Sequence, residues 1–290
     1  MNHNHPNTSN KRILVTGGEG TVAGYIHEVF KDYEVLLEGK KSLDITKKHD
    51  VDAYLNDTRP DYIIHLAALT DVDLCETNPE LALEVNFQGT KNITEGAQKL
   101  KIPLVYISTS AVFDGENPPS NGYKESDTPR PINYYAKTKL LGEKIIQDSL
   151  DDYIIVRAAW MIGGGKKEKK FISYILEKMQ NGEEIKAVND KFGTLTYAKD
   201  LVVFIRRLIE AKDNGLYHYS SYGFCSRFDI AIEMKKLLNS SSSVHGVSSQ
   251  EFAKKFPAPR PTHEVLGSEK IPFIKDWKTV LTDYIKTELL

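Results

Sequence analysis

Short apolar runs alternate with longer amphipathic stretches along the first half of the chain. The apolar runs that predict strands are Lys11–Thr16, Tyr33–Leu37, Asp61–Ala68, Pro103–Ser108 and Tyr153–Val156. The stretches with helical spacing of apolar residues are Thr21–Lys31, Val51–Asn56, Pro79–Leu100 and Asn133–Leu150. Strands that alternate with helices form right-handed crossovers between parallel strands, with helices on both faces of the sheet. The pattern therefore predicts an α/β fold built on a doubly wound, parallel Rossmann sheet.

Beyond Trp160 the alternation becomes irregular. Helical spacing returns at Phe171–Gln180 and Ala198–Ala211, and the remainder includes a serine-rich stretch, Asn239–Ser243, and a proline-rich one, Pro257–Pro261. We expect a smaller C-terminal α/β substrate lobe here. The predicted domain bounds are 11–160 for the Rossmann domain, with 192–214 returning to it, and 161–191 with 215–290 for the lobe.

Composition narrows the class of protein. Hydrophobic residues make up 40% and charged residues 27% of the 290 positions, as in globular proteins with a full core. The net charge of −2 gives no basic field for nucleic acid. Cys75 and Cys225 have no metal-ligand spacing and cannot form a disulfide framework, which suits a reducing compartment. With a polar start and no long apolar run, the protein is expected to be cytoplasmic, without a signal peptide, a membrane span, a metal or a nucleic-acid partner.

A glycine-rich segment follows the first predicted strand and precedes the first predicted helix. It reads Thr16-Gly17-Gly18-Glu19-Gly20-Thr21-Val22-Ala23. Glycines let the backbone turn sharply and approach a pyrophosphate, while the N–H groups that open a helix favour an anion. Ala23 stands where the dinucleotide fingerprint has its third glycine, which is an accepted variant. The segment therefore predicts a nicotinamide dinucleotide site with contacts from Gly17, Gly20, Thr21 and Val22.

The residues after the second predicted strand bear on the choice of cofactor. Gly39, Lys40 and Lys41 follow that strand, and no acidic residue is expected to close it in the way that favours NAD. A lysine there can pair with a 2′-phosphate, so NADPH is expected, with NADH as the alternative. Asp44 has two interpretations that stay open, a hydrogen bond to the adenine amine or a cap on the following helix.

Tyr135 and Lys139 form a YxxxK motif in the helix predicted before the last strand of the sheet. Side chains at i and i+4 share one helix face. An ammonium group beside a phenol favours the phenolate, and moving the tyrosine pKa from about 10 to about 7 takes about 4 kcal/mol. The pair therefore predicts proton exchange with a carbonyl or an alcohol. A second copy, Tyr174–Lys178, has no hydroxyl-bearing strand end before it and is interpreted as chance.

Thr109 directly follows the strand predicted at Pro103–Ser108. The carboxyl ends of parallel strands border the crevice where open α/β sheets bind ligands. Thr109 is therefore expected to hydrogen-bond a substrate carbonyl and polarise it, although a strand-end hydroxyl also serves as an ordinary cap. With Tyr135 and Lys139 it forms the predicted catalytic triad.

With these motifs in order, the chain resembles the extended short-chain dehydrogenase/reductases, and within them the dTDP-4-dehydrorhamnose reductase group. The segments that carry the resemblance run nearly from end to end. They are TGGEG at 16–20, LDIT at 43–46, HLAA at 65–68 with Val72-Asp73, Glu76 and Val85-Asn86, STSAVFDG at 108–115, the approach Glu125–Asn133, YYAKTKLLGE at 134–143, RAAW at 157–160, and Arg260-Pro261 with Leu266 and Lys270.

The resemblance implies a role for each matched residue. Tyr135 would be the general acid, Lys139 would bind the nicotinamide ribose and tune Tyr135, and Thr109 would orient the carbonyl. Trp160 would stack on the sugar, and Arg157 is left between a structural ion pair and a ligand contact. The remaining predicted contacts are Lys40, Asp44, Ile45, Ala67 and Ala68 to the cofactor, and Arg260, His263 and Glu264 to the substrate. The implied reaction passes hydride from NAD(P)H to the 4-keto group of a nucleotide-linked 6-deoxysugar, which gives an activated deoxysugar such as L-rhamnose.

Three positions depart from the pattern of that group. Ser110-Ala111 replaces Asp-Tyr after the catalytic threonine, His263-Glu264 replaces Asn-Ser, and Leu195 replaces the proline of a GxPT turn. The first two fall where the resemblance places the substrate. They therefore affect the choice of substrate and leave the hydride-transfer residues unchanged.

Two other functions stay open at this point. A nucleotide-sugar 4-epimerase of the same superfamily keeps the same triad, and the β subunit of methionine adenosyltransferase, a regulatory protein that binds NADP, resembles the same group. A 4,6-dehydratase needs an Asp-Glu pair after the threonine, and Ser110-Ala111 cannot do that acid–base work. The expected partner is a nucleotide-sugar substrate, and a homodimer is left open.

Overall fold

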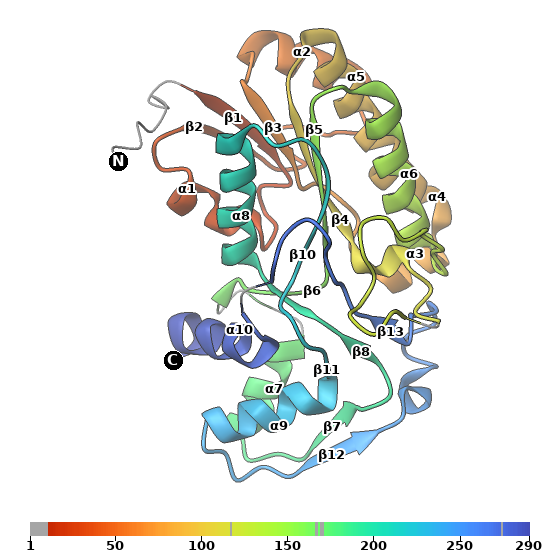
Figure 1. The fold of residues 1–290 in the computed structure, drawn as a ribbon, viewed down its shortest axis with the longest axis vertical. Coiled ribbons are helices and arrows are strands. Elements are labelled where there is room, and N and C mark those ends of the chain that lie inside the picture. The colour runs from red at the N-terminus through yellow and green to blue at the C-terminus, as the bar shows by residue number, and fades with distance from the viewer. Residues whose placement is uncertain (1–10, 117, 166–167, 169–170, 274) are drawn as a thin grey trace. The chain divides into compact units, whose positions relative to one another are not determined.

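The computed structural model describes residues 11–116, 118–165, 168, 171–273 and 275–290. They form two compact units (Figure 1). Unit 1 consists of the chain up to Ser108 with Tyr134–Arg157 and Lys199–Tyr217, and unit 2 consists of Thr109–Asn133, Ala158–Ala198 and His218–Leu290. The predicted domain bounds differ from these units in four places. Residues 109–133 and 158–160 belong to unit 2, and the segment that returns to unit 1 is 199–217, so it starts and ends later than the predicted 192–214.

A six-stranded sheet organises unit 1. Its strand order is β10-β5-β4-β3-β1-β2. The bounds of these strands, in that order, are Gly215–Tyr219, Tyr153–Ala158, Leu104–Thr109, Tyr62–His65, Arg12–Thr16 and Glu34–Glu38. β1 pairs in parallel with β2 and β3, and β3 pairs in parallel with β4. The chain passes from β1 to β2 on one side and returns to β3 on the other, so the order reverses between β1 and β3, where doubly wound sheets bind ligands beyond the strand ends.

Helices cover both faces of this sheet, with α5 and α6 on one side and α1 and α8 on the other (Figure 1). The helical segments of this part of the chain are η1 (Ala23–Tyr25), α1 (Ile26–Val29), α2 (Lys48–Thr58), α3 (Val72–Thr77), α4 (Pro79–Ala82), a π-helix (Leu83–Gly89), α5 (Thr90–Leu100), α6 (Tyr134–Ser149) and α8 (Ala198–Ala211). Arg206 of α8 donates to the Asp32 carboxylate just after α1, at 2.7 and 2.8 Å, which joins the two helices. The fully buried side chains of the core include Leu14, Leu55, Ile63, Ile93, Leu104, Ile146 and Ile155.

The helices predicted in unit 1 are present, one of them shorter than predicted, and α3 was not predicted. The helix predicted at Pro79–Leu100 is continuous, with the π-helix as its irregular part. The helix predicted at Thr21–Lys31 is shorter, because only Ala23–Val29 is helical and its first turn is of the tighter 3₁₀ type. A tight turn of this length places fewer aligned peptide dipoles behind the glycine segment than the prediction assumed.

Among its described residues, unit 2 combines one three-stranded and two two-stranded groups of short strands with three α-helices. The helices are α7 (Phe171–Gln180), α9 (Arg227–Leu237) and α10 (Trp277–Tyr284), the last continuing as a π-helix (Ile285–Leu289), with 3₁₀ turns at Ser110–Val112 and Ser249–Phe252. The strand groups are β11-β8-β13 (Cys225–Ser226, Phe192–Gly193, His263–Glu264), β12-β7 (Val244–Val247, Ile185–Val188) and β6-β9 (Trp160–Ile162, Leu195–Tyr197). Ser226 caps α9 in a capping box with Asp229. This capping pair is visible in the sequence, but the apolar pattern alone did not predict the helix.

Leu195, one of the departures from the family pattern, is fully buried in β9. Its N–H donates to the Ser221 hydroxyl at 3.0 Å, and its carbonyl accepts from the Ser221 N–H at 2.7 Å. A proline has no N–H to donate. The leucine therefore adds a hydrogen bond to this segment of unit 2.

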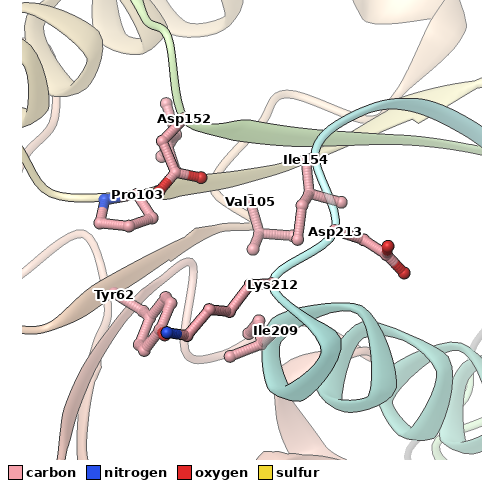
Figure 2. Close-up of a pocket in the computed structure, with 9 residues that line it drawn as sticks. Tyr62, Pro103, Val105, Asp152, Ile154, Ile209, Lys212 and Asp213 are labelled. Atoms are coloured by element: carbon pink, nitrogen blue, oxygen red, sulfur yellow. The ribbon is translucent and has the colours of Figure 1, made fainter.

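A cavity of about 210 Å³ lies in unit 1 (Figure 2). It is bounded by the first residues of β3, β4 and β5 and by the end of α8, including Tyr62, Leu104, Asp152 and Lys212. These are the amino ends of the strands, so the cavity lies at the opposite edge of the sheet from the strand ends that the dinucleotide motif follows. Among the described residues, no helix is long and apolar enough to cross a membrane.

Candidate active site

The glycine turn after β1 lies against the chain that leaves β3. Gly17 has φ +73°, and a Cβ on it would lie 2.6 Å from the Ala67 backbone nitrogen. The Gly20 N–H closes the turn on the Gly17 carbonyl at 2.9 Å. A side chain at Gly17 would fill the space at the point where the strand order reverses. Glycine leaves this space open, as the close approach of a pyrophosphate to the backbone requires. Thr21 and Val22 lead from this turn into η1.

The segment after β3 is fixed by a buried asparagine. Asn86, in the π-helix, accepts from the Leu69 N–H at 2.7 Å and donates to the Leu69 carbonyl at 3.1 Å. The two predicted cofactor contacts after β3, Ala67 and Ala68, directly precede Leu69. Ala67 is also the residue that the Gly17 backbone approaches. Ile45 lies in the core of the same unit, and its carbonyl accepts from Asn92 at 2.8 Å.

The end of β2 corrects the sequence prediction for the cofactor. β2 extends to Glu38, so an acidic residue does close this strand. The prediction missed it because the apolar run ends at Leu37. The Glu38 carboxylate accepts from the Tyr54 hydroxyl at 2.6 Å. Lys40 and Lys41 would attract a 2′-phosphate, whereas the negative charge of Glu38 would repel it. The hydrogen bond from Tyr54 holds the Glu38 carboxylate in place.

Asp44 forms a local turn. Its Oδ1 accepts from the N–H and the hydroxyl of Thr46, at 3.0 and 2.8 Å. Burial raises the pKa of Asp44. The hydrogen bonds from Thr46 and the charges of Lys40 and Lys47 lower it by more, so the net shift of the pKa is downward. The N-cap of α2 is Lys47. Asp44 therefore does not cap that helix, and its contact with adenine stays a prediction.

His65 joins three elements inside unit 1. Its Nδ1 lies 2.7 Å from the Thr16 hydroxyl and its Nε2 lies 3.0 Å from the Thr90 hydroxyl. Burial and the charge of Lys139 lower the pKa of His65 to about 3, so the ring is neutral at physiological pH. His65 therefore connects β1, β3 and α5, and its neutral ring adds no further positive charge beside Lys139.

Tyr135 and Lys139 lie one turn apart on α6, as predicted. Tyr135 is half-buried, whereas Lys139 is only 4% exposed, with its Nζ 3.9 Å from the centre of the Tyr106 ring. Burial lowers the pKa of Lys139 to about 7, against the opposing effect of Glu143. A lysine held this way is a cation with little hydration, which strengthens its effect on a neighbouring phenol.

The Glu143 carboxylate anchors α6 one turn beyond Lys139. Arg157, in β5, donates to it through Nε at 3.0 Å and through Nη2 at 2.7 Å, and the Ser108 hydroxyl of β4 also donates to it. Both charged groups are buried. Arg157 therefore forms the structural ion pair, which decides between the two interpretations that its sequence position allowed.

The first turn of α6 is fixed from the other side. The Tyr134 N–H donates to the Glu76 carboxylate at 3.0 Å, and Asn86 donates to the Thr138 hydroxyl at 3.1 Å. Thr138 in turn donates to the Tyr135 carbonyl at 2.8 Å. These contacts position the backbone that carries Tyr135.

Thr109, the last residue of β4, belongs to unit 2. Its hydroxyl oxygen accepts from the Ala111 N–H at 3.1 Å, so it caps the 3₁₀ turn at Ser110–Val112. This cap uses only the oxygen. The O–H is left as a donor, so the two interpretations of Thr109, cap and carbonyl contact, are compatible.

The predicted substrate residues of unit 2 form two groups. The indole Nε1 of Trp160 donates to Glu264 Oε1 at 3.2 Å, and the Ser110 hydroxyl donates to Glu264 Oε2 at 3.1 Å. His263 instead stacks on Phe192, with ring centres 5.3 Å apart. Two departures from the family pattern, Ser110 and Glu264, are therefore hydrogen-bond partners.

Two further positions complete this part of unit 2. Arg260 donates to the Ala258 carbonyl at 2.9 Å, and its guanidinium lies 5.4 Å from the centre of the Phe256 ring. Arg227, which no sequence motif indicated, has its guanidinium carbon 4.0 Å from the centre of the Trp160 ring. Tyr174 of the second YxxxK copy is 47% exposed, and its Lys178 pairs with Glu183.

Comparison with known proteins decides the family. A family model described as the RmlD substrate binding domain matches residues 11–289. The chain belongs to the dTDP-4-dehydrorhamnose reductase (RmlD) family. Its sequence is 36% identical to that of the dTDP-4-dehydrorhamnose reductase from Yersinia enterocolitica. The crystal structure of that protein matches with a TM-score of 0.89 over 96% of this chain and 100% of that chain.

Two other members of the comparison bear on function. The dTDP-4-dehydrorhamnose reductase of Bacillus anthracis, solved in complex with NADP, is 33% identical, with a TM-score of 0.90 over 96% of this chain and 99% of that chain. Methionine adenosyltransferase 2 subunit beta of Xenopus laevis is 28% identical over 90% of this chain and 81% of its own length. The chain is therefore similar in sequence both to reductases and to a protein named as a subunit of another enzyme.

Replacing Gly17 by alanine tests the glycine turn. The Cβ would meet the Ala67 backbone at a positive φ, so we expect unfolding to become easier by about 1–3 kcal/mol and the dissociation constant for NADPH to rise at least about tenfold. Gly24→Ala is the matched control, because nothing lies within 4 Å of its added Cβ. Chemical denaturation and fluorescence titration measure both effects, and equal behaviour of the two variants would contradict this account of the turn.

Replacing Lys139 by methionine separates stability from activity. The folded protein binds a proton on this lysine less tightly than the unfolded chain, whose lysine titrates near 10.4. Below pH 7 the lysine is charged in both states and the full cost of burial applies, and this cost declines as the pH rises from 7 to 10. We expect Lys139→Met to unfold at a higher temperature than wild type at pH 7, by about 2–4 °C for each kcal/mol recovered. The difference should shrink toward pH 10 in calorimetric scans, and a less stable variant at pH 7 would refute this assignment.

Proposed function

We propose that this RmlD-family protein is an NAD(P)H-dependent reductase of a nucleotide-linked 4-keto-6-deoxysugar, of the dTDP- or UDP-4-dehydrorhamnose type. The observation that supports it most is the buried Lys139 one turn after Tyr135, on a helix whose first residue is held by Glu76 of α3 and whose Glu143 is paired with Arg157 of β5. A scaffold that bound no dinucleotide would gain nothing from the cost of burying an ammonium group.

The residues of this chain divide the chemistry between them. NAD(P)H, when bound, supplies the hydride. The Tyr135 hydroxyl protonates the oxygen of the reduced carbonyl, and the Lys139 ammonium favours the phenolate that this leaves. The Thr109 O–H donates to the same carbonyl and polarises it, with its own oxygen held by the cap on Ala111. Gly17 and Gly20 admit the pyrophosphate.

Tyr135→Phe is the direct test of this role. In an assay that offers dTDP- and UDP-linked 4-keto-6-deoxyhexoses with NADPH, we expect the variant to lose at least about a hundredfold in turnover, because general acid catalysis contributes about 10²–10⁴. Tyr134→Phe, at the exposed neighbouring position, is the matched control and should retain activity. The reductase proposal fails if wild type and Tyr135→Phe are equally inert on every sugar offered while both bind NADPH.

For the cofactor we propose NADPH, on the strength of Lys40 and Lys41 and of the NADP complex of the Bacillus anthracis relative. Removing both lysines (Lys40→Gln with Lys41→Gln) should weaken NADPH binding about fivefold, since an exposed ion pair contributes up to about 1 kcal/mol, and leave NADH unchanged. Glu38→Gln should act in the opposite direction on NADPH. Dissociation constants from fluorescence titration decide this, and equal effects on NADPH and NADH would remove the lysines from the proposal.

A further inference from the structure

The Trp160 indole in unit 2 is contacted by the Gly193 backbone and by the Arg227 guanidinium. A Cβ on Gly193 would lie 2.6, 2.8 and 2.9 Å from indole Cε2, Cδ2 and Cζ2, so the Gly193 backbone covers one face at the ring junction. The Arg227 guanidinium carbon lies 4.0 Å from the ring centre. The Gly193 backbone and the Arg227 guanidinium therefore both contact the indole, which is only partly exposed. They occupy part of the space over the ring that a stacked sugar would need.

Arg227 is held by aromatic rings and has unused hydrogen-bond donors. Besides Trp160, its guanidinium lies 5.1 Å from the centre of the Phe171 ring. Among the described residues it has no hydrogen-bond or ion-pair partner, and the side chain is partly exposed. A guanidinium has five N–H donors in a planar fork that fits two oxygens of a phosphate. Cation–π contacts fix its position and leave the fork available.

Glu264 is the complementary group beside the same indole. A carboxylate has about four acceptor positions, and Ser110 and Trp160 occupy one on each oxygen. Burial raises the pKa of Glu264 and outweighs those hydrogen bonds and the charges of Arg227 and Arg260, which lower it, so the net shift is upward. The side chain is partly exposed, so its two remaining acceptor positions can take a donor from a ligand.

We propose that Arg227 and Glu264 recognise the two ends of a sugar phosphate, with a phosphate group on the Arg227 fork and a sugar hydroxyl or amino group on Glu264. The Trp160 indole, which contacts both side chains, then serves as the spacer between these two groups. The ligand class follows from two groups beside the Trp160 ring. The Arg227 guanidinium has N–H donors available for a phosphate, and the Glu264 carboxylate has acceptor positions available for a hydroxyl or amino group. Under the proposed function, on which this inference rests, the phosphate is that of the nucleotide diphosphate, and Glu264 is the residue that selects among sugars.

Binding measurements on the full chain with NADPH test the two halves separately. The probes are UDP and dTDP, which lack a sugar, and UDP-glucose and dTDP-glucose, which have no keto group to reduce. Arg227→Gln should weaken all four by about tenfold to a hundredfold, because each loses charge-assisted hydrogen bonds. Glu264→Gln should leave UDP and dTDP unchanged and weaken the glucose conjugates by about tenfold. Lys186→Gln, an exposed control in the same unit, should change none.

The outcomes separate this inference from the proposed reaction. Unchanged diphosphate binding in Arg227→Gln, an equal effect of Glu264→Gln on all four probes, or no binding by wild type would overturn the inference, whatever the hydride-transfer assay shows. The predicted pattern in a protein that reduces no 4-keto sugar would keep the inference and overturn the reductase. Arg227→Lys, which keeps the charge and loses the fork, should bind with intermediate affinity and guards against a Gln variant that fails to fold.

Discussion

The buried carboxylate of Glu143 is the point on which unit 1 depends. It receives the Arg157 guanidinium from β5 and the Ser108 hydroxyl from β4, so one side chain of α6 fixes that helix against two strands. Leaving either member of such a buried ion pair alone costs about 3–5 kcal/mol. The helix therefore has one register on the sheet, and Lys139, one turn earlier, is buried at a defined position against Tyr106. The opposing charge of Glu143 also limits how far burial can lower the lysine pKa.

Five of the six strands and the main helices of unit 1 followed from the apolar pattern, whereas β10 was not predicted and lies in the segment assigned to the lobe. α7 and α8 have the bounds that the pattern predicted. The shorter elements were missed for a physical reason. β8, β11 and β13 have two residues each, too few for any alternation to be visible, and they exist because tertiary contacts hold them. α9 did leave a signal, the capping pair Ser226 and Asp229.

The candidate site was predictable to a different extent in its two units. Tyr135, Lys139 and Gly17 lie in local motifs whose spacing encodes their geometry. The end of β2 was misjudged, because an apolar run says nothing of the polar residue that closes a strand, and Glu38 is such a residue. In unit 2, Ser110 and Glu264 are 154 positions apart, and no pattern in one sequence connects them. The contacts of Arg227 could not be predicted for the same reason, since its partners Trp160 and Phe171 belong to distant segments of the sequence.

The fate of one hydrogen atom tests the central claim most directly. With NADPH carrying deuterium at the transferable C4 position and a dTDP- or UDP-linked 4-keto-6-deoxyhexose, a reductase places one deuterium at C4 of the sugar for each NADPH consumed, and nuclear magnetic resonance of the product shows it there. A 4-epimerase would instead invert C4 of a dTDP- or UDP-linked 4-hydroxyhexose with no net consumption of NADPH, and a purely regulatory protein would give no sugar product from either kind of sugar. Deuterium at C4 in a one-to-one ratio is the predicted result, and its absence from every sugar offered would contradict the account.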